Sequence, residues 1–155
     1  MAGIVEENVI TQVGIIVRDI ERSKEKWAAF LGVPVPPTIS AGEYSVTKTR
    51  FRGEEAPDAT CLMAFFSGGP HLQVELIQPN GAPSTWQEFL DQKGEGIHHI
   101  AFRTQGMDKA VAAFEAAGME LVQRGLYGDA SGEYAYMDAT EDLKCIVELL
   151  ESYKR

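Results

Sequence analysis

Cysteine is scarce in this sequence, which has only Cys61 and Cys145 among its 155 residues. The two lie far apart and lack the spacing of a zinc site, so we interpret both as reduced thiols of the core. Long apolar runs are absent too, since no segment approaches the roughly 20 apolar residues of a membrane span. The first residues carry acids where a secretion signal would carry bases. These absences predict a cytoplasmic protein without a membrane-spanning segment.

Positive charge is also in short supply. The sequence has 14 Lys and Arg against 23 Asp and Glu, which gives a formal net charge of −9. Extended contact with nucleic acid or with an anionic membrane needs a basic surface, so we expect neither as a partner. A small anionic ligand responds to local charge and is not excluded. The length and the hydrophobic content of 45% suit a single domain over residues 1–155.

The hydrophobic pattern falls into two similar halves that meet at the glycines of residues 94–96. Asp19 and Ser84 are expected to cap helices, and Gly32 to end one. Each half is predicted to have βαβββ order, in modules of about residues 8–93 and 96–152. We expect strands at 10–17, 43–52, 60–67 and 71–78, then at 97–104, 119–124, 133–138 and 145–151, and helices at 23–31, 85–92 and 107–117.

The halves also resemble each other in residue detail. Residues 11–18 align with residues 98–104, and residues 72–78 align with residues 145–151. The second half is shorter between the aligned strands, so the first half must hold additional residues. The acidic, proline-containing region 33–58 and the short helix at 85–92 are the expected places for them.

The alignment places Gln12 on His99 and Glu75 on Glu148. A lone strand glutamate most often faces solvent, and a lone strand histidine is more often structural than a ligand. The match in both halves instead favours one shared metal site. One glutamine, two glutamates and one imidazole sum to −2, which balances one divalent cation, and mixed oxygen and nitrogen donors suit Zn²⁺, Mn²⁺, Fe²⁺, Co²⁺ or Ni²⁺.

The other histidines receive no ligand role. Strand alternation predicts that the rings of His98 and His99 point to opposite faces, and the repeat selects His99 as the ligand. We interpret His98 and His71 as structural or surface residues. The small residues Gly14 and Ala101 are expected to leave space beside the donors.

The segments that contain the four donors together resemble the vicinal oxygen chelate superfamily, also called the glyoxalase fold. These segments are residues 12–15, 74–79, 94–102 and 147–151. The resemblance implies an α+β fold in which two tandem βαβββ modules form a cupped, incompletely closed mixed β-barrel with flanking helices. It also implies one divalent metal ion (Zn, Co, Ni or Mn) between the modules. The modules of such proteins pair within one chain or across a homodimer, and a homodimer is expected here, with Trp27, Trp86 and Phe114 as candidate exposed contact residues.

Two enzyme groups of that superfamily compete. Residues 83–90 and 94–100 resemble methylmalonyl-CoA epimerase, which usually has histidine at the position of Gln12. The donor order glutamine–glutamate–histidine–glutamate is instead similar to glyoxalase I, the lactoylglutathione lyase. The glutathione-binding arginine and asparagine of glyoxalase I would fall on Ile16 and Pro79. The resemblance thus leaves an acyl-CoA thioester or a thiohemiacetal as the substrate.

Both enzymes remove a proton next to a carbonyl and use the metal to stabilise the charge that develops. The resemblance implies that Glu148 is the base, and Glu75 is positioned to serve the opposite face of the substrate carbon. Epimerases of this kind also use an early glutamate, for which Glu43, Glu54 and Glu55 are unassigned candidates. The alternative of another class is a non-catalytic, resistance-type protein that binds a small molecule.

Overall fold

The computed structural model describes residues 3–153 and has five helices and ten strands within that range. The helices are α1 (Ile20–Leu31), α2 (Tyr44–Thr47), α3 (Thr85–Lys93), α4 (Met107–Ala116) and α5 (Thr140–Leu143). The strands are β1 (Gln12–Ile16), β2 (Ile39–Ser40), β3 (Arg50–Phe51), β4 (Glu54–Glu55), β5 (Cys61–Ser67), β6 (Gln73–Pro79), β7 (Gly96–Arg103), β8 (Glu120–Leu126), β9 (Gly132–Ala139) and β10 (Cys145–Ser152).

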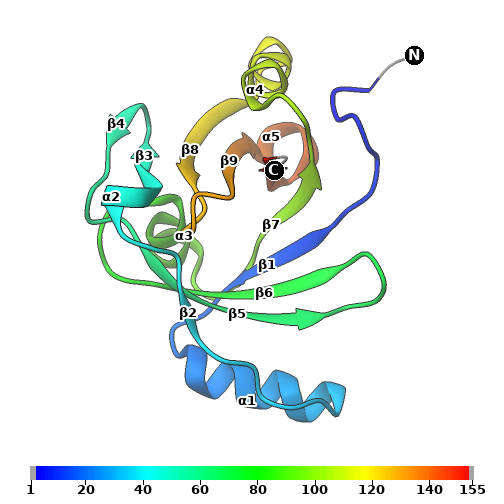
Figure 1. The fold of residues 1–155 in the computed structure, drawn as a ribbon, viewed down its shortest axis with the longest axis vertical. Coiled ribbons are helices and arrows are strands. Elements are labelled where there is room, and N and C mark those ends of the chain that lie inside the picture. Colours follow the sequence, from blue (N-terminus) through cyan, green and yellow to red (C-terminus); the bar gives the residue numbers. More distant parts are fainter. Residues whose placement is uncertain (1–2, 154–155) are drawn as a thin grey trace.

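All ten strands form one mixed sheet in the order β2-β5-β6-β1-β7-β10-β9-β8-β3-β4. The sheet curls into a cup, and helices lie on its outside (Figure 1). The end strands β2 and β4 are not neighbours in this order, so the barrel is incompletely closed. The predicted α+β architecture is confirmed.

The two modules pair within one chain. In the first, β1 runs parallel to β6, and in the second, β7 runs parallel to β10. The antiparallel pair β1–β7 then joins the modules, with Val13 opposite Ile100. The equivalent strands of the two halves therefore lie side by side at the centre of the sheet.

Each module has its own apolar layer between the sheet and a helix. On the first module, Ile20 and Ala28 of α1 pack with Leu76 in one buried cluster. On the second, α4 contributes Met107 and Phe114 to another. Burial of such large apolar side chains stabilises the fold by roughly 1.5–3 kcal/mol each.

The expected helix ends are present. The Asp19 side chain accepts from the Arg22 amide at 3.2 Å, and Ser84 Oγ accepts from the Gln87 amide at 3.0 Å. Gly32 follows α1 with φ 70°, a left-handed conformation that glycine adopts without steric cost.

The prediction of a strand over residues 43–52 is wrong. The β-branched residues there instead form α2, whose first turn is closed by the amides of Val46 and Thr47 donating to the Glu43 carbonyl. Tertiary packing overrides β-propensity because Thr47 and Thr49 are buried and their hydroxyls contact each other at 2.9 Å. Only Arg50–Phe51 of this range forms a strand, β3, and it pairs with β8 of the other module.

Residues 41–49 therefore connect one end of the sheet to the other. They leave β2 at the first end and lead through α2 to β3 at the second (Figure 1). Gly42 passes so close to the 126–132 turn that a Cβ on it would lie 2.8 Å from the Cα of Gly128. This connection belongs to the additional residues predicted for the first half.

Two aromatic residues expected to be exposed are buried. Trp86 is 4% exposed and packs with Tyr136, while Phe114 is 2% exposed on the inner face of α4. Their helical faces turn inward, so they offer no contact surface to a partner. Trp27 is half-buried and stacks edge-on against Phe30, which is 81% exposed.

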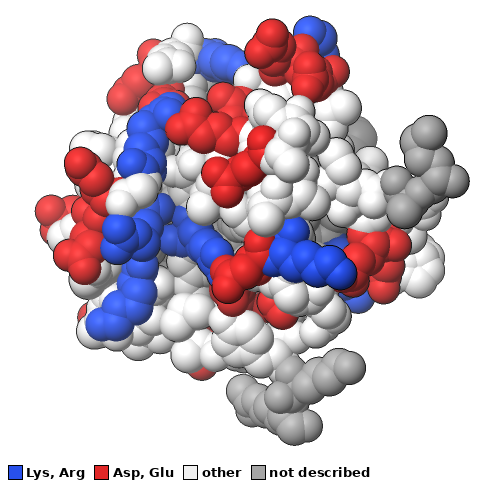
Figure 2. All heavy atoms as spheres, turned by 90° about the horizontal axis from the view of Figure 1, so that it is seen from above, with Lys and Arg blue, Asp and Glu red and all other residues white. Residues whose placement is uncertain are grey.

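Charges of both signs intermingle on the outside. Basic side chains lie among acidic ones on the face that Figure 2 shows. Arg124 contacts Asp108 at 2.8 Å and Glu133 at 2.6 Å, and Arg52 contacts Glu88 at 2.6 Å. Within residues 3–153, no helix is long and apolar enough to cross a membrane.

Candidate active site

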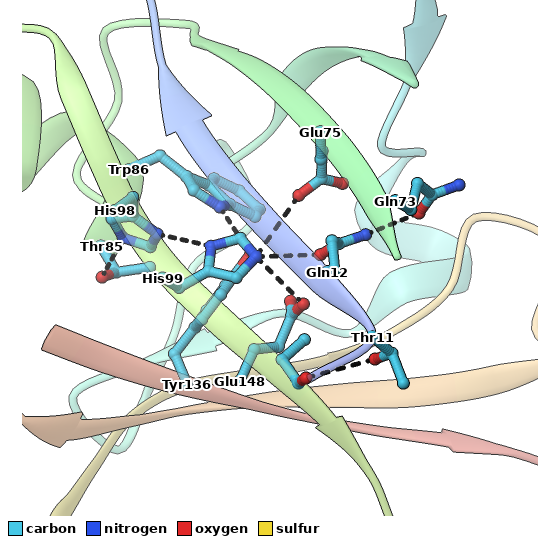
Figure 3. A network of polar contacts seen from close by, with 11 residues as sticks. Thr11, Gln12, Gln73, Glu75, Thr85, Trp86, His98, His99, Tyr136 and Glu148 are labelled. Atoms are coloured by element: carbon cyan, nitrogen blue, oxygen red, sulfur yellow. Dashed lines mark hydrogen bonds and ion pairs between the residues drawn. The ribbon is translucent and has the colours of Figure 1, made fainter. Parts of the chain in front are cut away.

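The four predicted donors come together at the centre of the sheet. Each donor lies on one of four strands that are neighbours in the sheet. The donors are Glu75 on β6, Gln12 on β1, His99 on β7 and Glu148 on β10. All four are buried, with exposed fractions between 0% and 7%. Their side chains point toward one another (Figure 3).

The imidazole of His99 is the hub of this cluster. Its Nε2 lies 2.9 Å from Gln12 Oε1, 3.3 Å from Glu148 Oε1 and 3.6 Å from Glu75 Oε1. Both of these glutamate oxygens are buried without a hydrogen-bond partner. Since an unpaired buried carboxylate is costly, the pair calls for a cation or for protons.

The donor distances are close to those found around a single metal ion. Two ligands at about 2.1 Å from a metal lie roughly 3.0–3.4 Å apart at cis or tetrahedral angles. The distances from His99 Nε2 bracket that range. Among residues 3–153, no three His, Cys, Asp or Glu side chains are already gathered as around a bound ion. The four residues therefore fit a divalent ion in chemistry, and Glu75, at 3.6 Å from His99 Nε2, must move closer to hold it.

Burial governs the protonation of the cluster. It raises the pKa of Glu75 well above its ordinary value, with a further rise from Glu148. It raises the pKa of Glu148 to about 8, against a smaller lowering by the Tyr136 hydrogen bond. Burial also lowers the pKa of His99 to about 3. The imidazole is thus neutral, which is its metal-binding form, and its contacts with the glutamates are not salt bridges.

A β-bulge brings the second histidine to the same side. Across the β1–β7 pair, Gly14 lies opposite His99 and Ile15 opposite Ile97, so His98 is the extra residue. The expectation that the two rings point to opposite faces is therefore wrong. His98 is 1% exposed, and its Nδ1 lies 2.9 Å from Nδ1 of His99.

Neighbouring residues give the cluster its space and orientation. Gly14 contacts the His99 ring so closely that a Cβ there would overlap it, and Ala101 is fully buried. Gln12 Nε2 donates to Gln73 Oε1 at 2.8 Å, which turns the Gln12 oxygen toward His99. The predicted role of small residues beside the donors agrees with this geometry.

Sequence reasoning missed an aromatic support beneath Glu148. Trp86 Nε1 donates to the Tyr136 hydroxyl at 3.0 Å, and Tyr136 lies beside Glu148, whose pKa it lowers. The alternation of Tyr134 and Tyr136 along one strand was the available signal, because such residues share a face.

A cavity of about 640 Å³ opens onto the cluster, and both glutamates line it. Its walls include Met63, Phe65, Trp86, Leu126, Tyr127, Tyr134 and Tyr136. A second cavity, of about 650 Å³, adjoins it through Gln12 and Gln73 and is lined by the exposed His71. Glu43, Glu54 and Glu55 are exposed and are not among the residues that line the first cavity.

The sequence and the fold place the chain in a family. Residues 11–136 match the Glyoxalase/Bleomycin resistance protein/Dioxygenase superfamily, and the chain belongs to it. The uncharacterized protein YqjC of Bacillus subtilis (strain 168) is 34% identical over 90 residues, which are 57% of this chain and 64% of that protein. The match thus spans less than two thirds of that relative.

Solved structures share the fold at low identity. Methylmalonyl-CoA epimerase from Mycobacterium tuberculosis superposes with a TM-score of 0.65 at 23% identity, covering 99% of this chain and 94% of that one. The hypothetical protein BH1468 from Bacillus halodurans C-125 gives 0.67 at 18% identity, covering 97% and 98%. Methylmalonyl-CoA epimerase from Streptomyces coelicolor gives 0.61 at 21%, covering 94% and 97%.

Proposed function

We propose that the protein is a divalent-metal-dependent isomerase that epimerises an acyl-CoA thioester by removing the proton next to its carbonyl. One observation carries this proposal. Two glutamates with unpaired buried oxygens face a neutral imidazole at the base of a cavity that can admit a small molecule.

Each residue of the cluster has a part in this chemistry. Gln12 and His99 would hold the ion as neutral donors, and Glu75 and Glu148 would add carboxyl oxygens. The ion supplies positive charge where the carbonyl oxygen becomes negative. Glu148, as a carboxylate, would take the proton from the carbon. Glu75, in its protonated form, would give one to the opposite face, so that each turnover exchanges the protonation states of the two glutamates.

The surroundings help the two glutamates to act as bases. Burial raises the pKa of both carboxyls, which makes their carboxylates better proton acceptors. Tyr136 lies beside Glu148, and the apolar part of the cavity wall would limit the access of water to the reacting carbon.

The choice of substrate rests on similarity of fold. Several solved relatives are methylmalonyl-CoA epimerases, and the structure of one contains 2-nitronate-propionyl-CoA while another contains methylmalonyl-CoA. An epimerase needs a proton carrier on each face of one carbon, which the placement of Glu75 and Glu148 on either side of His99 supports (Figure 3).

Glyoxalase I activity on a thiohemiacetal is the second candidate, and the donor set of one glutamine, two glutamates and one histidine favours it. The expected glutathione contacts speak against it. The position of the glutathione-binding arginine is Ile16, which is 0% exposed within an apolar cluster. Pro79 offers no side-chain hydrogen bond in place of the asparagine.

One experiment separates these activities. Protein purified without chelator is expected to carry roughly one divalent metal per chain by elemental analysis. Incubated with methylmalonyl-CoA in deuterated water, it should exchange the α-hydrogen and interconvert the epimers. Formation of lactoylglutathione from methylglyoxal and glutathione instead would establish the second candidate. A chain that binds no metal and catalyses neither reaction would be the non-catalytic binding protein.

The homodimer and the cytoplasmic location remain predictions of the sequence and its resemblance. The former is tested by sedimentation equilibrium. Each chain carries all four donors on its own strands, so a dimer is not needed to complete the cluster.

A further inference from the structure

Three polar contacts run in series through the paired histidines (Figure 3). Gln12 Oε1 lies 2.9 Å from His99 Nε2, and His99 Nδ1 lies 2.9 Å from His98 Nδ1. His98 Nε2 then lies 3.1 Å from Thr85 Oγ1, at the start of α3. We call His99, His98 and Thr85 the histidine relay.

The hydrogen bonds of the relay can run in only two directions, which differ in the donor and the acceptor at each contact. A neutral imidazole carries one hydrogen, on one of its two nitrogens. Both rings are buried, His98 at 1% and His99 at 0% exposure, and burial disfavours the charged imidazolium form. The nitrogen that carries hydrogen at one contact therefore fixes the donor at the next contact.

Without a metal, Gln12 sets the direction. Its Nε2 donates to Gln73, so its oxygen is the atom that faces His99 and can only accept. His99 must then donate from Nε2 and accept at Nδ1. As a result His98 donates from Nδ1, and its Nε2 accepts from the Thr85 hydroxyl.

With a metal, the direction must be opposite. Coordination by His99 needs a bare Nε2, which moves its hydrogen to Nδ1. That hydrogen is donated to His98 Nδ1, so His98 carries its own on Nε2 and donates to Thr85. We propose that metal binding reverses the histidine relay, and that His98 is the positioning residue that holds His99 in its metal-binding tautomer. This inference rests on the proposed metal dependence of the site.

The protons balance in this exchange. The His98 Nδ1 hydrogen passes to His99 Nδ1, and the Thr85 hydroxyl hydrogen passes to His98 Nε2. The hydroxyl is reprotonated by solvent through the cavity of about 200 Å³ that Thr85 lines. The former Nε2 hydrogen of His99 leaves on the side of Glu75 and Glu148. Each ring keeps one proton throughout.

Nitrogen-15 NMR of the histidine rings tests the reversal directly, with Zn²⁺ alone as the diamagnetic probe. The metal-free chain should show hydrogen on Nε2 of His99 and on Nδ1 of His98. One equivalent of zinc should exchange both assignments. If zinc binds and either ring keeps its tautomer, the inference is overturned while α-hydrogen exchange can still establish the enzyme. If zinc does not bind, both fail. If both rings switch without any exchange of substrate hydrogen, the relay stands and the proposed function fails.

A matched pair of variants tests the positioning role. His98→Asn keeps an oxygen near the Nδ1 position that can accept from His99, whereas His98→Leu removes it. Zinc affinity, measured by competition with a chromophoric chelator, should fall about 10–100-fold in the leucine variant and much less in the asparagine variant. Equal zinc affinity in native-like folded forms of both variants would overturn the role. The NMR experiment on the unaltered chain decides the reversal even if a variant does not fold.

Discussion

Gly14 lies directly opposite His99 across the β1–β7 pair, and the imidazole occupies the space that any side chain on Gly14 would need. The glycine is therefore required by the histidine and not by a turn. Its backbone is an ordinary strand, so the contact alone restricts the position.

Gly14→Ala is expected to weaken metal binding at least about tenfold, because the added methyl group displaces the His99 ring from the three oxygens that face its Nε2. Overpacking should also lower the free energy of unfolding by roughly 1–3 kcal/mol. Zinc titration and urea unfolding measure the two effects. The control is Gly68→Ala, whose new Cβ meets only ordinary contacts at 3.4 Å. Unchanged zinc affinity in Gly14→Ala would contradict the requirement.

Glu148→Gln should lower the rate of α-hydrogen exchange by at least about 100-fold, because the amide cannot accept the proton. The fold should persist, since the side chain keeps its size and loses an ionisable group from a buried site. Circular dichroism checks the fold, and Glu115→Gln on the exposed face of α4 is the matched control. Activity like that of the unaltered chain would rule out Glu148 as the base.

The stability of the metal-free chain should fall as the pH rises from about 6.5 to 8. The folded chain keeps Glu148 protonated up to about pH 8, and Glu75 likewise has a raised pKa, whereas both ionise freely when unfolded. Each such carboxyl lowers the free energy of unfolding by roughly 1.4 kcal/mol per pH unit in this window. Urea unfolding at several pH values measures the slope.

Below pH 6.5 the histidines oppose this trend. The pKa values of His98 and His99 are lowered, so the unfolded chain binds protons there that the folded chain does not. This contribution offsets that of the two glutamates between about pH 4.5 and 6.5, and stability falls with the pH below about 4.5. Glu148→Gln should remove the falling contribution of this carboxyl throughout pH 4.5–8 and leave the region below about pH 4.5 unchanged. A stability that rises between pH 6.5 and 8 would contradict the burial of protonated carboxyls.

Gln73 is expected to tune the metal site from outside the donor set. Gln73→Leu removes the acceptor that fixes the Gln12 amide, so zinc affinity should fall about tenfold. Gln73→Glu keeps an acceptor oxygen and should bind zinc much more tightly than the leucine variant. Because Gln73 is exposed, both variants should fold, and the same affinity in both would contradict an orienting role.

The sequence predicted the strands that carry the donors because those strands repeat. Gln12 and Glu75 could be matched to His99 and Glu148 by alignment alone, and the structure gathers all four. A repeat reveals what two halves share. It is silent on features that occur in one half only.

The bulge at His98 and the helix α2 are such features. Alternation places consecutive strand residues on opposite faces, and one extra residue in β7 cancels that rule locally. Likewise, residues 44–47 have the β-branched composition of a strand but form a helix, because the chain must turn there to reach β8. Both depend on contacts between segments distant in sequence, which local patterns do not contain.

The connection of residues 41–49 joins the two ends of a sheet that does not close on itself. The length of this connection therefore limits how far apart the two ends of the sheet can move. Ala41 and Gly42 of this segment also line the cavity of about 640 Å³ that opens onto the two glutamates. Insertion or deletion here offers a route by which relatives could admit bulkier or slimmer ligands while the chemistry at the base stays the same.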